Sequence, residues 1–122
     1  MGSKGSILII DDDTEFQTLS TLILGGQGYE IIAAENGQAA LDILSTQTPA
    51  LIVLDLRMPS MNGVDFLKAY HAMSVQPVPV IMVSAGSAVP ISLAQDMPNI
   101  GTFLSKPFSP SALRNAVAEY LS

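Results

Sequence analysis

The chain contains no cysteine and no tryptophan, and only five of its 122 residues are lysine or arginine. The absence of cysteine excludes disulfides, thiolate nucleophiles and cysteine-bound metals. Eleven acidic residues outnumber the basic ones and give the chain a formal net charge of −6. Because nucleic-acid backbones are bound by positively charged surfaces, we expect no nucleic-acid binding by this domain.

Long hydrophobic runs are also missing. Hydrophobic residues make up 48% of the chain and the mean hydropathy is +0.41, yet the apolar runs are far shorter than the ~20 residues that span a bilayer. Residues 1–5 lack the pattern of a signal or transit peptide, so we expect a tag or a disordered N-terminus there and a cytoplasmic protein. Residues 6–122 are expected to form one domain.

Short apolar runs alternate with segments of helical periodicity. The length of the runs and their content of isoleucine, valine and leucine predict buried strands. Alternation of such strands with helices predicts an α/β domain in which helices cover both faces of a parallel sheet. We expect strands at residues 6–10, 30–34, 51–54, 80–83 and 102–105.

The intervening helices are expected to have one apolar face each. Phe16, Leu19 and Ile23 recur at i, i+3 and i+7 in the first helix, which two glycines end at residues 25 and 26. Prolines at positions 90 and 98 predict that the helix over residues 90–97 is short and irregular. The last helix is expected to pack on the sheet through an apolar stripe. The members of that stripe are Leu113, Val117, Tyr120 and Leu121.

Polar residues follow four of the expected strands directly. In open parallel sheets, ligands bind outside the carboxyl ends of the strands, near the point where the strand order reverses. A sheet ordered 2-1-3-4-5 makes the first and third strands neighbours, so Asp11, Asp12 and Asp55 are predicted to converge. The strand-end residues in chain order are Asp11, Asp12, Asp13, Asp55, Ser84, Lys106 and Pro107.

Such a group of residues predicts phosphoryl-transfer chemistry. Three converging carboxylates repel one another unless a cation lies among them, and hard oxygen ligands suit Mg²⁺. Lys106 would supply a positive charge for phosphate oxygens, and Ser84 would supply a hydroxyl donor. A carboxylate surrounded by a metal, a lysine and a hydroxyl can act as the nucleophile that accepts a phosphoryl group.

The same motifs carry a family resemblance. Asp11-Asp12, Asp55 within Val-Leu-Asp-Leu-Arg-Met-Pro, Met-Asn-Gly at 61–63, Ser84-Ala85 and Phe-Leu-Ser-Lys-Pro at 103–107 occur in order. With them the chain resembles the receiver domain of two-component response regulators, over residues 6–121. The resemblance implies a flavodoxin-like (CheY-like) doubly wound sheet of five parallel strands in the order 2-1-3-4-5, with helices on both faces.

The resemblance also implies the roles of the acidic residues. Asp55 would accept a phosphoryl group from the phosphohistidine of a histidine kinase or a histidine phosphotransfer protein. Asp12 and Asp55, with the backbone carbonyl of Arg57, would ligate Mg²⁺, for which Mn²⁺ can substitute. Asp11 would act on the metal mainly through water.

Further roles follow from the resemblance at the other strand ends. Lys106 would pair with Asp55 and later with its phosphate, and the Lys106–Pro107 bond is expected to be cis. Ser84 and Phe103 would be the switch residues that respond to phosphorylation. A modulating role for two residues at the entrance to the site is a hypothesis of our own. These residues are Arg57 and Gly86, and Arg57 is expected to alter the rate at which the acyl phosphate is lost.

The resulting expectation is a signalling phosphoacceptor in a phosphorelay and not an enzyme. It would control an unknown output partner, with homodimer formation on phosphorylation as one outcome, and would have no membrane partner. The domain would be either free-standing or part of a hybrid kinase or longer regulator. Residues 87–102 depart from the usual family pattern, which leaves open a receiver-like interaction module that is not phosphorylated.

A haloacid-dehalogenase-type phosphohydrolase is a more distant alternative. That class also uses an aspartate nucleophile after the first strand, a serine or threonine and a lysine. It needs the pattern Asp-x-Asp-x-Thr, whereas the corresponding positions here are Asp11, Asp13 and Glu15. The last position therefore does not fit this alternative.

Overall fold

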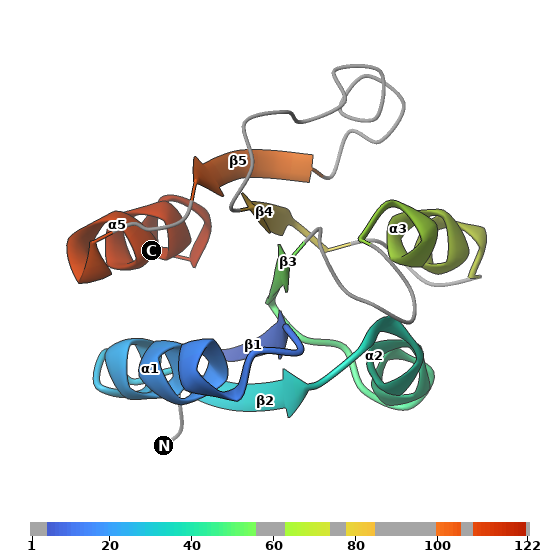
Figure 1. The fold of residues 1–122 in the computed structure, drawn as a ribbon, viewed down its shortest axis with the longest axis horizontal. Helices are drawn as coiled ribbons and strands as arrows, with labels where there is room; N and C mark the ends of the chain where they lie inside the picture. The colour runs from blue at the N-terminus through green and yellow to red at the C-terminus, as the bar shows by residue number, and fades with distance from the viewer. Residues whose placement is uncertain (1–4, 56–62, 74–77, 85–99, 106–108, 122) are drawn as a thin grey trace.

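The computed structural model describes residues 5–55, 63–73, 78–84, 100–105 and 109–121. In this part of the chain a parallel sheet lies between two layers of helices (Figure 1), as the alternating pattern predicts. The strands are β1 (Ser6–Ile10), β2 (Glu30–Ala34), β3 (Leu51–Asp55), β4 (Val80–Ser84) and β5 (Ile100–Ser105), in the order β2-β1-β3-β4-β5. The helices are α1 (Thr14–Gly25), α2 (Gly37–Leu44), α3 (Gly63–Ala72) and α5 (Pro110–Leu121).

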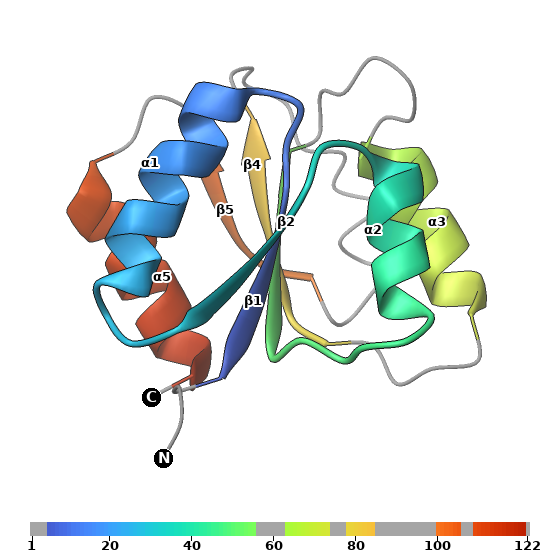
Figure 2. The same ribbon diagram turned by 90° about the horizontal axis from the view of Figure 1, so that it is seen from below.

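Both faces of the sheet are covered by helices. Helices α1 and α5 lie on one face and α2 and α3 on the other (Figure 2). In β1, Leu8 and Ile10 point to the α2/α3 core, whereas Ile7 and Ile9 point to the α1/α5 core. All four side chains are fully buried. This two-sided burial explains why the strand reads as a continuous apolar run without polar alternation.

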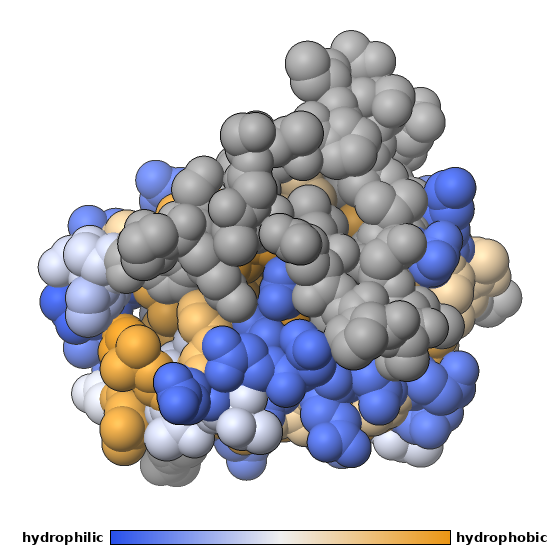
Figure 3. All heavy atoms as spheres, in the orientation of Figure 1, coloured by the Kyte–Doolittle hydropathy of each residue, from blue (hydrophilic) through white to orange (hydrophobic). Residues whose placement is uncertain are grey.

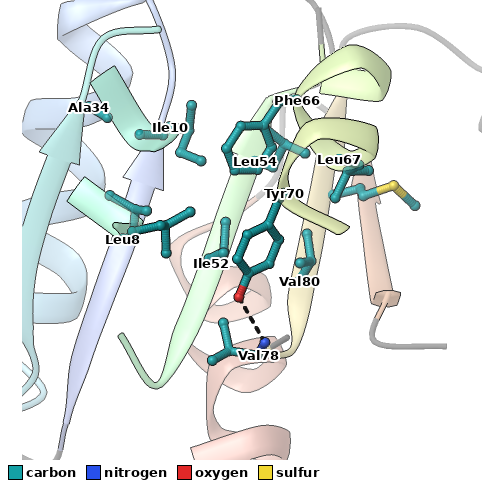
Figure 4. Close-up of a cluster of buried hydrophobic side chains, with 13 residues drawn as sticks. Leu8, Ile10, Ala34, Ile52, Leu54, Phe66, Leu67, Tyr70, Val78 and Val80 are labelled. Atoms are coloured by element: carbon teal, nitrogen blue, oxygen red, sulfur yellow. Dashed lines mark hydrogen bonds between the residues drawn. The ribbon is translucent and has the colours of Figure 1, made fainter. Parts of the chain in front are cut away.

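An aromatic pair anchors α3 to the sheet. The rings of Phe66 and Tyr70 stack with their centroids 5.9 Å apart and their planes 13° from parallel. The Tyr70 hydroxyl accepts a hydrogen bond from the backbone N–H of Val78 at 3.0 Å (Figure 4). Val78 lies two residues before β4, so this buried contact ties the end of α3 to the start of the next strand.

The expected packing faces of α1 and α5 need correction. Leu19 does not share the buried side of Phe16 and Ile23, because 53% of its surface is exposed. Helix α1 instead turns Ser20 and Leu24 toward the sheet. In α5 the prediction for Tyr120 is wrong, since this side chain is 36% exposed. An amphipathic tyrosine can lie at the end of an apolar stripe and keep its hydroxyl in water.

The last strand begins earlier than predicted. It starts at Ile100, two residues before the expected start at Thr102. Opposite it, Val80 pairs with Ile100 but Met82 pairs with Phe103, so β5 has one more residue than β4 over this stretch. This register shift interrupts the regular alternation of residues by which a strand is recognised in a sequence.

The helices of the described ranges are also too short or too polar to cross a bilayer. The expected helix over residues 90–97 and the motif at 61–63 lie largely or wholly outside those ranges. Ser84 and Phe103 are placed by the backbone of β4 and β5. The described part of the expected site is formed by the ends of β1 and β3 and by the turn that follows β1.

Candidate metal centre

Three aspartates meet at the carboxyl ends of β1 and β3. Asp11 and Asp12 follow β1 directly, and Asp55 is the last residue of β3. The two strands are neighbours, and their register pairs Ile10 with Leu54, so Asp11 and Asp55 are the next residues along each strand. One carboxylate oxygen from each aspartate lies within 4.8 Å of the other two. The predicted convergence of these three residues is confirmed.

The three clustered side chains differ in their exposure to solvent. The side chain of Asp11 is fully buried, that of Asp55 is 7% exposed, and that of Asp12 is exposed. Hydrophilic residues gather near the middle of the face that Figure 1 presents (Figure 3). Two negative charges 4.8 Å apart repel by about 3 kcal/mol at an effective dielectric constant of about 20. A cation among the three carboxylates would convert this repulsion into attraction.

The donor set fits a hard divalent cation. All three groups are carboxylates, the ligands that such cations prefer. Softer metals prefer thiolate or imidazole ligands, but the chain has no cysteine and its single histidine, His71, is exposed on α3. The carboxylate cluster can therefore hold a metal of the magnesium, calcium or manganese type.

Hydrogen bonds fix the backbone of the turn after β1. The Asp11 N–H donates to the carbonyl of Ala34 at 3.1 Å. The Asp11 carboxylate accepts from the N–H of Asp13 at 2.9 Å. The side-chain amide of Gln17 donates to the carbonyls of Asp11 and Ala34 at 2.6 and 2.7 Å. Gln17 was not among the residues that the sequence suggested, because a glutamine in an amphipathic helix gives no local signal of such a contact.

Asp13 caps helix α1. Its carboxylate accepts from the N–H groups of Glu15 at 3.0 Å and Phe16 at 3.4 Å, and its backbone is extended as an N-cap requires. Asp13 is not among the three clustered aspartates. The phosphohydrolase alternative would need Asp11 and Asp13 to act together as its Asp-x-Asp pair. The carboxylate of Asp13 instead caps helix α1, which does not fit that alternative.

The remaining site predictions concern residues on or beyond the described strands. Ser84 ends β4, one step past the Asp55–Val83 pair, so its backbone lies at the same edge of the sheet as Asp55. Phe103 lies within β5. The roles of both side chains stay predictions. Four further predicted residues lie outside the described part of the chain, namely Arg57, Gly86, Lys106 and Pro107.

The sequence matches the response regulator receiver domain family over residues 7–118. Sporulation initiation phosphotransferase F of Bacillus subtilis (strain 168) is 32% identical over 117 residues, which cover 94% of this chain and 92% of that protein. Transcriptional regulatory protein GlrR of Escherichia coli (strain K12) is 33% identical over 116 residues. Those residues cover 94% of this chain but only 26% of GlrR.

A solved structure agrees with these matches. A response regulator receiver domain protein (CheY-like) from Methanospirillum hungatei JF-1 superposes with a TM-score of 0.86 at 28% identity. The superposition covers 97% of this chain and 94% of the other. Sequence and fold therefore agree over almost the whole chain, and the acidic cluster lies where the motifs predicted it. The chain belongs to the response regulator receiver domain family.

Proposed function

We propose that this receiver domain accepts a phosphoryl group on Asp55 in a Mg²⁺-dependent reaction and then changes conformation to control an output partner. One observation carries the proposal: the nearly buried carboxylate of Asp55 lies within 4.8 Å of the carboxylates of Asp11 and Asp12. Three carboxylates held this close repel one another, and a divalent cation among them would offset that repulsion.

Mg²⁺ is the cation that this domain would use, with Mn²⁺ as a substitute. The ligands would be Asp12, Asp55 and the backbone carbonyl of Arg57, while Asp11 would act mainly through water. Mg²⁺ binds through one or two carboxylates and keeps several waters, which agrees with a cluster open to solvent on its Asp12 side. When bound, the cation neutralises negative charge on the phosphoryl oxygens.

Phosphoryl transfer would proceed by in-line displacement. A carboxylate oxygen of Asp55 forms a bond to phosphorus while the bond between phosphorus and the imidazole nitrogen of a phosphohistidine breaks, and the imidazole leaves. The product is an acyl phosphate. Lys106 would pair with its negative charge, Ser84 and Phe103 would shift in response, and Arg57 with Gly86 would modulate its loss. The domain thus takes part in one transfer at a time and is not an enzyme with a turned-over substrate.

The proposed partners follow from this chemistry. The donor of the phosphoryl group would be a histidine kinase or a histidine phosphotransfer protein. The domain would act in the cytoplasm. The word phosphotransferase in the name of the Bacillus subtilis relative supports phosphoryl transfer as the shared chemistry. GlrR is much longer than the matched region, which supports regulation of an attached or separate output domain. Residues 6–122 would form the receiver. The expectation of a tag or disordered N-terminus over residues 1–5 does not hold at Gly5, whose carbonyl accepts a hydrogen bond from the Glu30 N–H at 2.9 Å.

A small-molecule phosphodonor tests the proposal directly. The protein is incubated with acetyl phosphate, with and without Mg²⁺, and its intact mass is measured. We expect the wild type to gain one phosphoryl group only with Mg²⁺, and Asp55→Asn to gain none. Asp42→Asn is the matched control, because Asp42 is exposed on α2 and pairs with Gln38 away from the cluster. It should be phosphorylated as the wild type is.

Two results would contradict the proposal. A folded wild type that never gains a phosphoryl group would instead favour the interaction module that works without phosphorylation. An Asp55→Asn variant that is modified as fully as the wild type would place the acceptor elsewhere.

A further inference from the structure

Gln17 connects helix α1 to the ends of two strands. Its half-buried side-chain amide donates one hydrogen bond to the carbonyl of Asp11 at 2.6 Å and another to the carbonyl of Ala34 at 2.7 Å. Asp11 follows the last residue of β1, and Ala34 is the last residue of β2. One amide group therefore fixes the carboxyl ends of both strands relative to α1.

The contact with Asp11 acts on the peptide that links two clustered aspartates. A peptide bond is planar, so the carbonyl oxygen of Asp11 and the Cα of Asp12 share one rigid unit. A hydrogen bond to that oxygen restrains rotation of the unit and with it the direction of the Asp12 side chain. The Asp11 N–H is held separately by Ala34 at 3.1 Å. The backbone of Asp11 is thus held at both its donor and its acceptor.

Restraint matters here because the clustered charges oppose one another. With three carboxylate oxygens within 4.8 Å, the exposed Asp12 side chain would gain by moving away into water. Because the linking peptide is already held in place, less conformational entropy is lost when a cation binds. Groups that orient metal ligands typically change metal affinity by about 10- to 100-fold when they are removed.

The side-chain chemistry of Gln17 suits this task. A primary amide offers two N–H donors, one for each carbonyl, and carries no charge. An ionised glutamate of the same shape would donate no hydrogen bond and would add a negative charge beside the cluster. A lysine would donate hydrogen bonds, but its positive charge would compete with the metal.

We propose that Gln17 is a positioning residue for the divalent cation: it fixes the Asp11–Asp12 peptide so that both carboxylates face Asp55. This inference rests on the proposed function, since it presumes that the cluster binds Mg²⁺. Gln17 itself touches neither the cation nor the phosphoryl group. Its effect is expected in metal affinity and in the backbone of the turn, and not in the identity of the phosphoacceptor.

The test replaces Gln17 by methionine, which keeps the length and removes both donors. The dissociation constant for Mg²⁺ is measured by calorimetry, and amide hydrogen exchange at Asp12 and Asp13 is measured without metal. We expect Gln17→Met to bind Mg²⁺ about 10-fold more weakly, at the lower end of the range for such groups. Exchange at the two amides should become faster in the metal-free protein.

Two control variants separate positioning from a general loss of stability. Ile23→Val removes one methyl group from a partly buried side chain near the other end of α1 and should lower the melting temperature of the protein. Gln38→Met makes the same replacement on α2, where the exposed amide donates to the carboxylate of Asp42 at 3.1 Å. Both should keep the Mg²⁺ dissociation constant within about twofold of the wild-type value, because sites far apart act independently.

Each outcome decides the matter. A folded Gln17→Met that binds Mg²⁺ as the wild type does overturns the positioning role, and so does an equal weakening in Ile23→Val. If Gln17→Met does not fold, Gln17→Asn replaces it, because its amide is one methylene shorter and cannot reach both carbonyls. A wild type that binds Mg²⁺ no better than Asp55→Asn refutes the proposed function, and the positioning role fails with it.

Discussion

The two faces of the sheet are built differently. On the α2/α3 face, the stacked rings of Phe66 and Tyr70 fill the core, and the Tyr70 hydroxyl has a buried backbone partner. On the α1/α5 face, Ser20 is buried and its hydroxyl has no hydrogen-bond partner within the described ranges. Every exposed large apolar side chain of the described residues also belongs to α1 or α5. These side chains are Leu19, Leu22 and Tyr120.

The helices on the two faces of the sheet have different roles. The start of α1 contacts the metal cluster region in two ways: the backbone N–H of the N-cap residue Asp13 donates to the Asp11 carboxylate, and the side-chain amide of Gln17 donates to the Asp11 carbonyl. Hydrophobic atoms reach the surface over the part of the molecule where α1 lies (Figure 3). Helix α3 is held mainly by apolar packing, together with the buried hydrogen bond that the Tyr70 hydroxyl accepts from the Val78 N–H. The α2/α3 face mainly stabilises the fold. Helix α1 is packed less completely, but it forms hydrogen bonds to the turn that carries Asp11 and Asp12.

Truncation of Phe66 should have the largest effect on stability. Phe66 is fully buried, and Phe66→Ala removes its ring from the core, which typically costs about 3–5 kcal/mol of unfolding free energy. Urea denaturation measures this loss. Leu22→Ala on the opposite face is the control, because Leu22 is 70% exposed and its loss should change stability by no more than about 0.5 kcal/mol. Equal losses for the two variants would contradict the contrast between the faces.

Removal of a single hydroxyl on the α2/α3 face should have the next largest effect. Tyr70→Phe keeps the ring but takes away the acceptor of the Val78 N–H, and the loss of a buried hydrogen bond costs about 1–3 kcal/mol. Urea denaturation gives the free energy, and amide exchange at Val78 should become faster. An unchanged exchange rate would mean that this bond does not hold the start of β4.

The fold was largely predictable because its strongest signals are local. A strand covered on both faces needs an unbroken apolar run, and the sequence has such runs at β1, β3 and β4. Asp55 was predictable for the same reason, since a carboxylate that ends a buried apolar strand has no ordinary structural use. The meeting of Asp55 with Asp11 and Asp12 then followed from the expected strand order.

The features that were missed depend on contacts between distant segments. The start of β5 depends on a register shift in its pairing with β4, and the burial of Ser20 in place of Leu19 depends on how α1 is rotated on the sheet. Gln17 meets Ala34, which is 17 residues away in sequence. None of these contacts leaves a pattern within a short window. The sequence therefore revealed the charged residues of the site better than the neutral residue that holds them.

Replacement of Ser20 should raise stability. The hydroxyl is buried and makes no hydrogen bond to the described residues, so Ser20→Ala removes an unsatisfied polar group and should stabilise the protein by about 1 kcal/mol. Thr18→Ala on the exposed side of α1 reports the gain from helix propensity alone, about 0.5 kcal/mol. The melting temperature and urea midpoint of both variants are compared. A destabilised Ser20→Ala would mean that this hydroxyl has a favourable partner.

The smallest effect is expected at Asp13, and it tests whether this residue belongs to the cap or to the cluster. Asn caps helices about as well as Asp, so Asp13→Asn should change stability by less than about 0.5 kcal/mol. Because Asp13 lies outside the three clustered aspartates, Mg²⁺ affinity measured by calorimetry should fall by no more than about twofold, from the loss of one nearby charge. Asp12→Asn should weaken binding much more, since it removes a carboxylate of the cluster itself. If the two variants weaken Mg²⁺ binding equally, α1 contributes a metal ligand and not only a cap. Asp13 would then serve both as the helix cap and as a metal ligand, and the two roles could not be assigned to different residues.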